Sequence, residues 1–463
     1  MGDPLPVTSR VASWKWGVVW LLFLATVINY MDRQTIGVLS GPIKTAFTSD
    51  QSSLALGGLF EETPRADTGK RHLSEGGYGW IEFAFGFTFA TFQFVAGSLV
   101  DRSSLRWCYA GALVLWSAAG FLTGLATTVE ILILCRIVLA VGEAFNWPCA
   151  VSSVQRLLPR EQRSLANGIF HSGASIGAIV TPLLVLSMVG RSGAGWQTVF
   201  FVVGGGGAVW AVLWLAYLRG ERAAIIDHPA GGEANVAPAD TFRELLCRPQ
   251  LWIAIAVGVC VNICWHFCRV WLPRYLDVDL HFSFKGTDTV MATVPLPWGE
   301  WKLSPADVGL LIQSGFYVAA DLGSLTAGYV TRRIIHAGVP VERARKVVQL
   351  GTAALCLFTV PAMYAANPWV TIPLLYVVAA GSMGGFANYF ALTQEVSPRR
   401  TAQVLGLTGA AAWYTVASLN PIVGGIADNI KTFVPLFMAV GVVPLVGACV
   451  GLLWRKQTAA ARS

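Results

Sequence analysis

The stretch Trp16-Gly-Val-Val-Trp-Leu-Leu-Phe-Leu-Ala-Thr-Val-Ile-Asn-Tyr-Met-Asp-Arg33 is an apolar run that ends on charge. A hydrophobic segment of about 20 residues crosses the hydrocarbon layer of a bilayer, so this stretch predicts a transmembrane helix. Apolar residues resume at Ile36, and we expect the helix to run to about Phe47. Ionisable side chains at that depth are costly unless they face a polar cavity, so Asp32 and Arg33 indicate a functional site. Charges that snorkel to the headgroups at a helix end are the alternative.

The composition agrees with a membrane protein along the whole chain. Of 463 residues, 54% are hydrophobic and 13% are charged, whereas about a quarter of an ordinary soluble protein is charged. The net charge of +7 raises the question of nucleic acid, but the basic residues are dispersed between apolar runs. Because they form no patch, we expect no nucleic-acid partner.

Twelve apolar segments are long enough to span a membrane, in two sets of six. The break between the sets is rich in Pro, Gly and Ala, which is typical of a linker. The sequence therefore predicts an all-α membrane protein with a six-helix bundle at 1–218, a linker at 219–249 and a second bundle at 250–463. The expected spans are 17–47, 78–100, 107–127, 130–155, 164–189, 196–218, 250–278, 304–331, 346–366, 369–394, 402–427 and 432–454.

The Lys and Arg residues give the expected orientation. Loops that follow even-numbered spans carry most of them, whereas several of the opposite loops hold one or none. The positive-inside rule then places both termini and the linker in the cytoplasm. The first span has no small-residue cleavage site after it, so we expect it to be retained in the membrane.

The two sets of spans repeat a pattern at matched positions. Gly97-Ser-Leu-Val-Asp-Arg102 follows the second span, and Gly328-Tyr-Val-Thr-Arg-Arg333 follows the eighth. Duplicated halves in a membrane protein indicate a transporter whose site lies near the midplane, where the repeats meet.

Several motifs resemble those of one family. Gly97-Ser-Leu-Val-Asp-Arg-Ser-Ser-Leu-Arg106 resembles the loop between helices 2 and 3 of the major facilitator superfamily, with Ser104 where a glycine is usual. Ile28-Asn-Tyr-Met-Asp-Arg33 is similar to the first-helix motif of its anion:cation symporter family. Further resemblances, the last three of them to the hexuronate (glucuronate and galacturonate) branch, are in Arg136 with Gly142-Glu-Ala144, Gly173–Ala178, Trp271–Leu276, Ala320–Gly323, Arg345-Lys346 and Trp413.

The resemblance implies a transporter of the bacterial inner membrane that imports a sugar-acid anion with protons by alternating access. It implies that Asp32 and Glu143 carry protons. It also implies that Tyr30, Arg33 and Arg136 hold the carboxylate of the substrate.

Two departures from the family pattern bear on the substrate. His171 stands where relatives commonly have Asn, and the eleventh helix lacks a polar residue near Gly409 that some sugar-acid relatives use. The identity of the sugar acid is therefore left open.

The chemistry of these residues suggests how substrate and proton are coupled. Arg136 and Glu143 are seven residues apart and so lie on nearly one helix face, about 10 Å apart. An Arg fork suits a carboxylate, because it donates two parallel hydrogen bonds and stays charged. When substrate occupies Arg33 or Arg136, the neighbouring Asp32 or Glu143 is neutralised less well and takes a proton, so each ligand favours the other. A fixed Arg136–Glu143 network is the alternative.

In the second set of spans, Asn262, His266 and Arg269 follow helical i, i+4, i+7 spacing and share one face. They lie on the counterpart of the first helix, so we expect them to complete the cavity. His171 is a further substrate-binding candidate; for it and His266 a neutral, hydrogen-bonded ring is the alternative.

Tyr389 and Trp413 offer flat faces for the apolar side of a sugar ring, with core or lipid-facing rings as the alternative. A soft metal site is suggested by three cysteines near His266, but small residues at every fourth position are ordinary helix-packing material. We therefore expect no metal and no cofactor. The cysteines in question are Cys260, Cys264 and Cys268.

Further charges are expected to gate the cytoplasmic side. Asp321 is expected to pair with Arg345 or Arg332 as a latch. In the first bundle, Asp101 is expected to pair with Arg102 and Arg106 in the same way.

Two polar insertions, 48–77 and 279–303, follow the first and seventh spans, which occupy equivalent positions. Both are expected outside the cell, where they meet over the mouth as a partial lid. Disordered loops are an equal alternative.

The sequence favours a transporter over other classes. It shows no nucleophile–base pairing, phosphate loop or metal cluster of useful specificity, so we expect no enzyme. The expected partners are a small anionic substrate, protons and lipid, and we expect a monomer. An importer of another organic anion, Na⁺ coupling, and a receptor that has lost transport are the alternatives.

Overall fold

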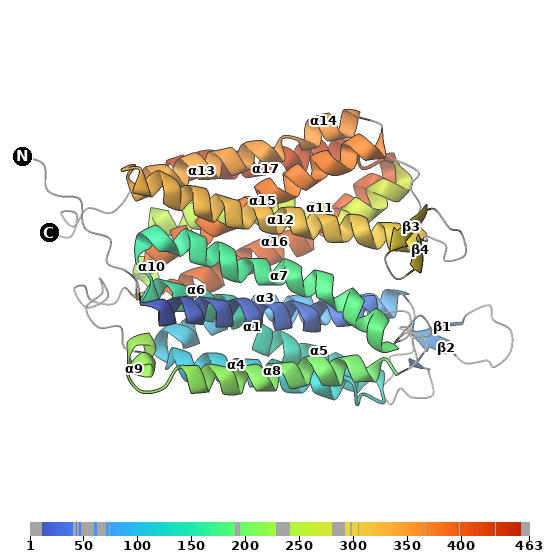
Figure 1. Ribbon diagram of the computed structural model, residues 1–463, viewed down its shortest axis with the longest axis horizontal. Coiled ribbons are helices and arrows are strands. Elements are labelled where there is room, and N and C mark those ends of the chain that lie inside the picture. The colour runs from blue at the N-terminus through green and yellow to red at the C-terminus, as the bar shows by residue number, and fades with distance from the viewer. Residues whose placement is uncertain are drawn as a thin grey trace, which may run out of the picture.

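The computed structural model describes residues 12–39, 43, 46–47, 60–62, 71–73, 75–189, 195–227, 241–279, 292–296, 299–303, 305–365, 367–397, 399–430 and 432–454. In this part of the chain, long helices lie side by side, and two small hairpins stand at one end of the bundle (Figure 1).

The helices before and after the linker are called here the first and second halves. Those of the first half are α1 (Ser13–Val38), α3 (Glu75–Arg102), α4 (Leu105–Thr123), α5 (Val129–Glu143), α6 (Asn146–Leu157), α7 (Arg160–Val189) and α8 (Gln197–Tyr217). Two short helices lie between the halves, α9 (Glu221–Asp227) and α10 (Phe242–Leu246). Those of the second half are α11 (Pro249–Val278), α12 (Pro305–His336), α13 (Val341–Cys356), α14 (Thr359–Tyr364), α15 (Pro368–Val396), α16 (Thr401–Ile430) and α17 (Val434–Leu452).

Proline explains why two of the expected spans are each divided into two helices. A proline has no N–H and its ring clashes with the carbonyl four residues earlier, so a helix breaks there. Pro148 places this clash at Ala144, between α5 and α6, and Pro361 places it at Leu357, between α13 and α14.

The helix lengths and their apolar character fit a membrane. Among the described residues, nine helices are long and apolar enough to cross it. The pair α5 and α6, together with α12 and α16, supplies the remaining three of twelve spans. Large apolar side chains such as Val212 and Leu322 are exposed on the outside of the bundle, as lipid contact requires.

The first expected span continues beyond α1. This helix ends at Val38, with a turn at Leu39. Further along, the N–H groups of Ile43 and Phe47 donate to the carbonyl oxygens of Leu39 and Ile43, at 3.0 and 3.2 Å, which is the i to i−4 pattern of an α-helix. These bonds agree with the predicted helical end at about 47, and residues 40–42 and 44–45 lie outside the described part of the chain.

Small residues allow the helices near the centre to approach closely. A side-chain carbon added at Gly173 or Gly177 of α7 would lie 2.5 Å from a carbonyl oxygen of α1, at Phe23 and Val27 respectively. Gly168 of α7 faces Ser324 of α12 in the same manner, at 2.9 Å. This is the small-residue packing of membrane helices, and it brings α7 against the second half.

The two ends of the bundle have different structures. At one end, here called the linker face, α1 begins, α17 ends and α9 and α10 lie; at the other, the hairpin face, stand the two hairpins (Figure 1). The antiparallel pairs are β1 (Phe60–Glu62) with β2 (Arg71–Leu73), and β3 (Ala292–Leu296) with β4 (Gly299–Leu303). The rest of the insertions 48–77 and 279–303 lies almost wholly outside the described residues, so the lid remains a hypothesis.

Candidate functional site

An ion pair joins two helices in the middle of the first half. Arg33 of α1 donates from Nη2 and Nε to Oε2 of Glu143 at the end of α5, at 2.8 and 3.1 Å. The Glu143 side chain is fully buried, and its other oxygen, Oε1, has no hydrogen-bond partner among the described residues. A buried carboxylate that is held through one oxygen only is sensitive to whatever else binds the arginine.

A second carboxylate lies beside this pair. Asp32 is 2% exposed, and within the described part of the chain neither of its oxygens has a hydrogen-bond partner. It faces Gly120 of α4, where an added side-chain carbon would lie 2.7 Å from Oδ1. The glycine therefore makes room for the buried Asp32 side chain.

Aromatic rings surround the Arg33 guanidinium. Its central carbon lies 4.5 Å from the ring centre of Phe89, 5.4 Å from Tyr30 and 5.6 Å from Trp413 of the second half. Arg136 is buried nearby, 4.8 Å from the ring of Phe85. Cation–π contacts stabilise an arginine in apolar surroundings through the face of its guanidinium group. The N–H groups lie in the plane of that group and can still donate hydrogen bonds to other partners. Arg33 thus reaches from the Glu143 pair to the boundary between the halves.

A cavity of about 480 Å³ lies at that boundary. Both halves line it, which is where the sequence placed the site. Seven of its residues are Tyr, Trp or Phe, and no carboxylate is among the lining residues described. They are Tyr30, Gln93, Trp147, His171, Asn262, Trp265, His266, Phe386, Tyr389, Phe390, Leu405, Gly409 and Trp413.

The structure brings six of the predicted substrate-binding residues together. These are Tyr30, His171, Asn262, His266, Tyr389 and Trp413, all of which line the cavity. Arg33 is at its edge, over the ring of Trp413. Arg136, Arg269, Asp32 and Glu143 are not among the lining residues.

His171 lies in an aromatic slot. Its ring stacks on Phe386 at 4.7 Å and is 5.1 Å from Trp147. Its Nδ1 atom has no hydrogen-bond partner in the described residues. The alternative was a neutral His171 ring that is hydrogen-bonded within the protein. No such bond is made by Nδ1 in the described residues, and this nitrogen remains available to a ligand.

The polar groups of the second half are partly used within the protein. Asn262 donates from Nδ2 to the carbonyl oxygen of Gly258 at 2.8 Å. Nδ1 of His266 is 3.4 Å from Nη2 of Arg269, and the Tyr389 hydroxyl bonds to that of Thr408 at 2.7 Å. These bonds fix the side chains against the cavity, as a preorganised site requires.

Sequence reasoning missed six lining residues, namely Gln93, Trp147, Trp265, Phe386, Phe390 and Leu405. Rings in an apolar span are the usual core material, so the rings among them carried no signal. Gln93 stands alone in the phenylalanine-rich run 83–94, and a lone amide in such a run is a signal that was available.

An ion-pair triad joins the two halves at the linker face. Glu395 of α15 bonds to Arg345 of α13 and to Arg160 of α7, which belongs to the other half. Arg345 also donates to the carbonyl oxygen of Arg160 at 2.8 Å. The predicted pairing of Asp321 with Arg345 or Arg332 is wrong, because Arg345 bonds to Glu395 and the Arg332 Nε bonds to His336. Asp321 instead lies buried in α12, with no ion pair in the described residues.

A second contact between the halves involves Asp101. Its carboxylate accepts from the backbone N–H groups of Ala402 and Gln403, at 3.1 and 2.8 Å, in the first turn of α16. A helix N-terminus favours an anion, because its N–H groups are unpaired and its dipole is positive there. The expected pairing with Arg102 and Arg106 is wrong: Arg106 bonds to the carbonyl oxygen of Leu215, and Arg102 is exposed.

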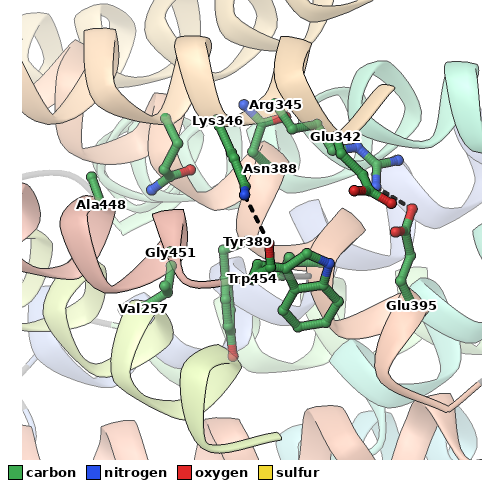
Figure 2. A pocket seen from close by; sticks show the side chains of 12 residues that line it. Val257, Glu342, Arg345, Lys346, Asn388, Tyr389, Glu395, Ala448, Gly451 and Trp454 are labelled. Atoms are coloured by element: carbon green, nitrogen blue, oxygen red, sulfur yellow. Dashed lines mark hydrogen bonds and ion pairs between the residues drawn. The ribbon is translucent and has the colours of Figure 1, made fainter. Parts of the chain in front are cut away.

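A further cavity of about 490 Å³ lies inside the second half, next to this triad (Figure 2). The two basic groups that line it already have protein partners: Lys346 donates to the carbonyl oxygens of Leu452 and Trp454 at 2.9 and 2.7 Å, and Arg345 bonds to Glu395. Tyr389 lines both cavities. Because both basic groups here are bound within the protein, the cavity between the halves is the better candidate for an anionic ligand.

Metal binding finds no support in the geometry. Across the described ranges, no group of three or more His, Cys, Asp or Glu side chains could hold a metal ion.

Known proteins resemble this chain over most of its length. The "Hexuronate transporter" of Escherichia coli strain K12 is 27% identical over 95% of this chain and 94% of its own. A "D-galactonate transporter" of another E. coli strain is 24% identical, with 92% of each chain covered. Among solved structures, the E. coli fucose:proton symporter has a TM-score of 0.60 at 14% identity over 96% of this chain and 100% of its own. A proton:xylose symporter has a TM-score of 0.64 at 16% identity, covering 96% and 95%.

The two solved structures are too distant in sequence to show more than the shared fold. The family description for the Major Facilitator Superfamily matches residues 22–298, which is more than half of the chain. The twelve spans and the central cavity agree with it, and the chain belongs to the Major Facilitator Superfamily.

Proposed function

We propose that this protein is a proton-coupled symporter that imports a sugar-acid anion, a hexuronate or a related aldonate, by alternating access. The observation that carries the proposal is the double position of Arg33, which is bound to Glu143 on one side and borders the cavity on the other. The printed names of the curated relatives, a hexuronate and a D-galactonate transporter, support a sugar acid as the cargo.

The coupling follows from competition for one arginine. A substrate carboxylate that enters the cavity binds the Arg33 fork and draws it from Oε2 of Glu143. Glu143 is buried and keeps no other described hydrogen bond at Oε1, so it takes up a proton. Substrate and proton therefore bind together more tightly than either alone, as reciprocal linkage requires.

The remaining residues have roles that follow from their positions. Asp32 takes up a further proton beside Glu143, while Arg136 and Tyr30 assist in holding the carboxylate. Residues that hold the body of the sugar acid are His171, Asn262, His266, Tyr389 and Trp413, with Arg269 behind His266.

The two ends of the bundle give the direction of transport. The predicted linker 219–249 joins the two bundles at the linker face. By the positive-inside rule this face is cytoplasmic. The triad around Glu395 and the Asp101 contact then close the cytoplasmic side in this structure. Import requires that loading of the cavity with substrate and proton lets the halves rock and break these bonds.

Uptake by proteoliposomes tests the proposal. Labelled glucuronate, galacturonate and galactonate are offered with an inward proton gradient, with a sodium gradient and with neither. Accumulation of at least one sugar acid that requires the proton gradient is the expected result. Accumulation driven by sodium alone contradicts the proton coupling, and uptake of other organic anions but of no sugar acid contradicts the cargo.

A further inference from the structure

Among the described lining residues of the cavity, Gln93 is the one from α3, and the coupling mechanism does not use it. It is 3% exposed and lines the cavity between the halves. Within the described residues its Oε1 atom has no hydrogen-bond partner. A buried amide oxygen without a partner is unfavourable, so this group is positioned to accept a hydrogen bond from a ligand in the cavity.

The Gln93 side chain fills a space that belongs to another helix. A side-chain carbon added at Gly409 of α16 would lie 2.6 Å from Oε1 of Gln93 and 2.8 Å from its Nε2. One turn earlier, an added carbon at Gly406 would lie 2.4 Å from the backbone oxygen of Gln93. The two glycines therefore let α3 approach α16 closely, and the Gln93 amide occupies the place where a side chain at 409 would project.

Gln93 also lies on the same face of α3 as the rings that hold the arginines. Phe85, Phe89 and Gln93 follow each other at intervals of four residues. Phe85 and Phe89 lie against the Arg33 guanidinium, at 5.0 and 4.5 Å. The α3 helix runs towards the linker face, so Gln93 is about 6 Å deeper along the helix than Phe89. A ligand whose carboxylate is at Arg33 extends its other end towards Gln93.

We propose that Gln93 is a specificity-determining residue: its amide bonds to a hydroxyl group of the sugar acid, remote from the carboxylate, in the space that Gly409 leaves open. An amide can donate and accept at once, and a sugar hydroxyl can do the same, so the two groups are matched. This inference rests on the proposed function and adds the group that selects a hydroxylated anion over a plain carboxylate.

The expected discrimination is large for a single residue. A site built to bond a hydroxyl rejects an analogue that lacks it, because the buried polar group is then left unpaired. Removal of the amide should therefore weaken binding of the hydroxylated ligand and leave that of the analogue nearly unchanged.

The test compares two anions in proteoliposomes. Glucuronate is the hydroxylated anion, and tetrahydropyran-2-carboxylate, which has the ring and the carboxylate without hydroxyl groups, is offered as a competitor. In Gln93→Leu, the half-saturating glucuronate concentration should rise about tenfold, while the inhibition constant of the analogue changes less than about twofold. Gln197→Ala at the start of α8, outside the lining of the cavity, is the matched control and should resemble the wild type.

A swap of the amide between helices provides a second readout. Gly409→Asn alone should lower the melting temperature and glucuronate uptake, because the new side chain meets that of Gln93. Gln93→Ala with Gly409→Asn removes this collision and returns an amide to the same space, so both values should recover. A double variant no better than Gly409→Asn contradicts the proposed fit of the two residues.

The outcomes separate this inference from the function on which it rests. A wild type that moves no sugar acid overturns both. A second outcome is that the wild type accumulates glucuronate, while Gln93→Leu weakens the binding of both anions equally or of neither. This result leaves the symporter in place and overturns the role of Gln93.

Discussion

Two buried arginine–glutamate contacts in this protein use the same chemistry and differ in what they join. Arg33 and Glu143 belong to one half and lie beside the cavity. Glu395 binds Arg345 of its own half and Arg160 of the other, at the linker face. A pair inside one half can respond to a ligand without any movement of the halves. A pair across the halves must break when they separate, so it responds to conformation.

Under the proposed function, the central pair serves coupling and the linker-face triad serves closure. Each has an oriented carboxylate in a place of low dielectric, where loss of one partner is costly. The difference predicts that central substitutions change what drives transport, whereas linker-face substitutions change which side is open.

The largest effect is expected from Arg33→Ala. It removes the proposed substrate anchor and leaves Glu143 without its ion pair, a loss of about 3–5 kcal/mol for a buried pair. Glucuronate uptake should fall at least about a hundredfold. Arg33→Lys keeps the charge but not the fork and should recover only a small part of uptake. Full recovery in the lysine variant would contradict bidentate binding.

Glu395→Gln should have a smaller effect on uptake and a large one on conformation. It removes the shared carboxylate of Arg160 and Arg345, so the linker face should open by about tenfold in population. Spin labels at Ser103 and Arg343, in a background without native cysteines, report the separation of the halves there. Glu143→Gln is the control, and an equal lengthening of the distance in both variants would remove the distinction between the two pairs.

Asp101→Asn should open the same face by less. The amide oxygen retains one bond to the first turn of α16 but loses the charge and the second bond, worth about 1–2 kcal/mol. The same spin-label pair should show a shift between those of the wild type and Glu395→Gln. A shift larger than that of Glu395→Gln would make Asp101 the principal closing contact.

The smallest effect is expected from Asp321→Asn. Asp321 is buried but lies outside the cavity lining and has no ion pair in the described part of the chain. Proton-driven uptake should change less than about twofold, measured beside Asp32→Asn as the sensitive counterpart. A loss comparable to that in Asp32→Asn would show a third coupling carboxylate.

The sequence predicted the spans well because length and apolar character determine them. Eleven of the twelve expected segments begin and end within a few residues of the observed helices, taking the divided spans as one. The first expected segment extends beyond α1, which ends at Val38, and the described residues Ile43 and Phe47 keep helical hydrogen bonds there. The breaks at Ala144 and Leu357 were readable from Pro148 and Pro361 but were not predicted.

The site was only partly predictable for a physical reason. Asp32, Arg33 and Glu143 are charges in apolar spans, which is a local signal. Glu395 is also such a charge, but its partner Arg160 is 235 positions away, and nothing local specifies which long-range pair forms. For the same reason Asp321 was paired wrongly, and the fit of Gln93 over Gly409 required the contact of α3 with α16.

The measurement that tests the central claim most directly is proton-driven accumulation against exchange in Glu143→Gln. Glutamine keeps the shape of the side chain but cannot take up a proton. The account predicts that gradient-driven accumulation of glucuronate is lost while exchange of internal for external glucuronate remains, because exchange needs no net proton movement. Undiminished accumulation in Glu143→Gln, and likewise in Asp32→Asn, would contradict the proposed coupling.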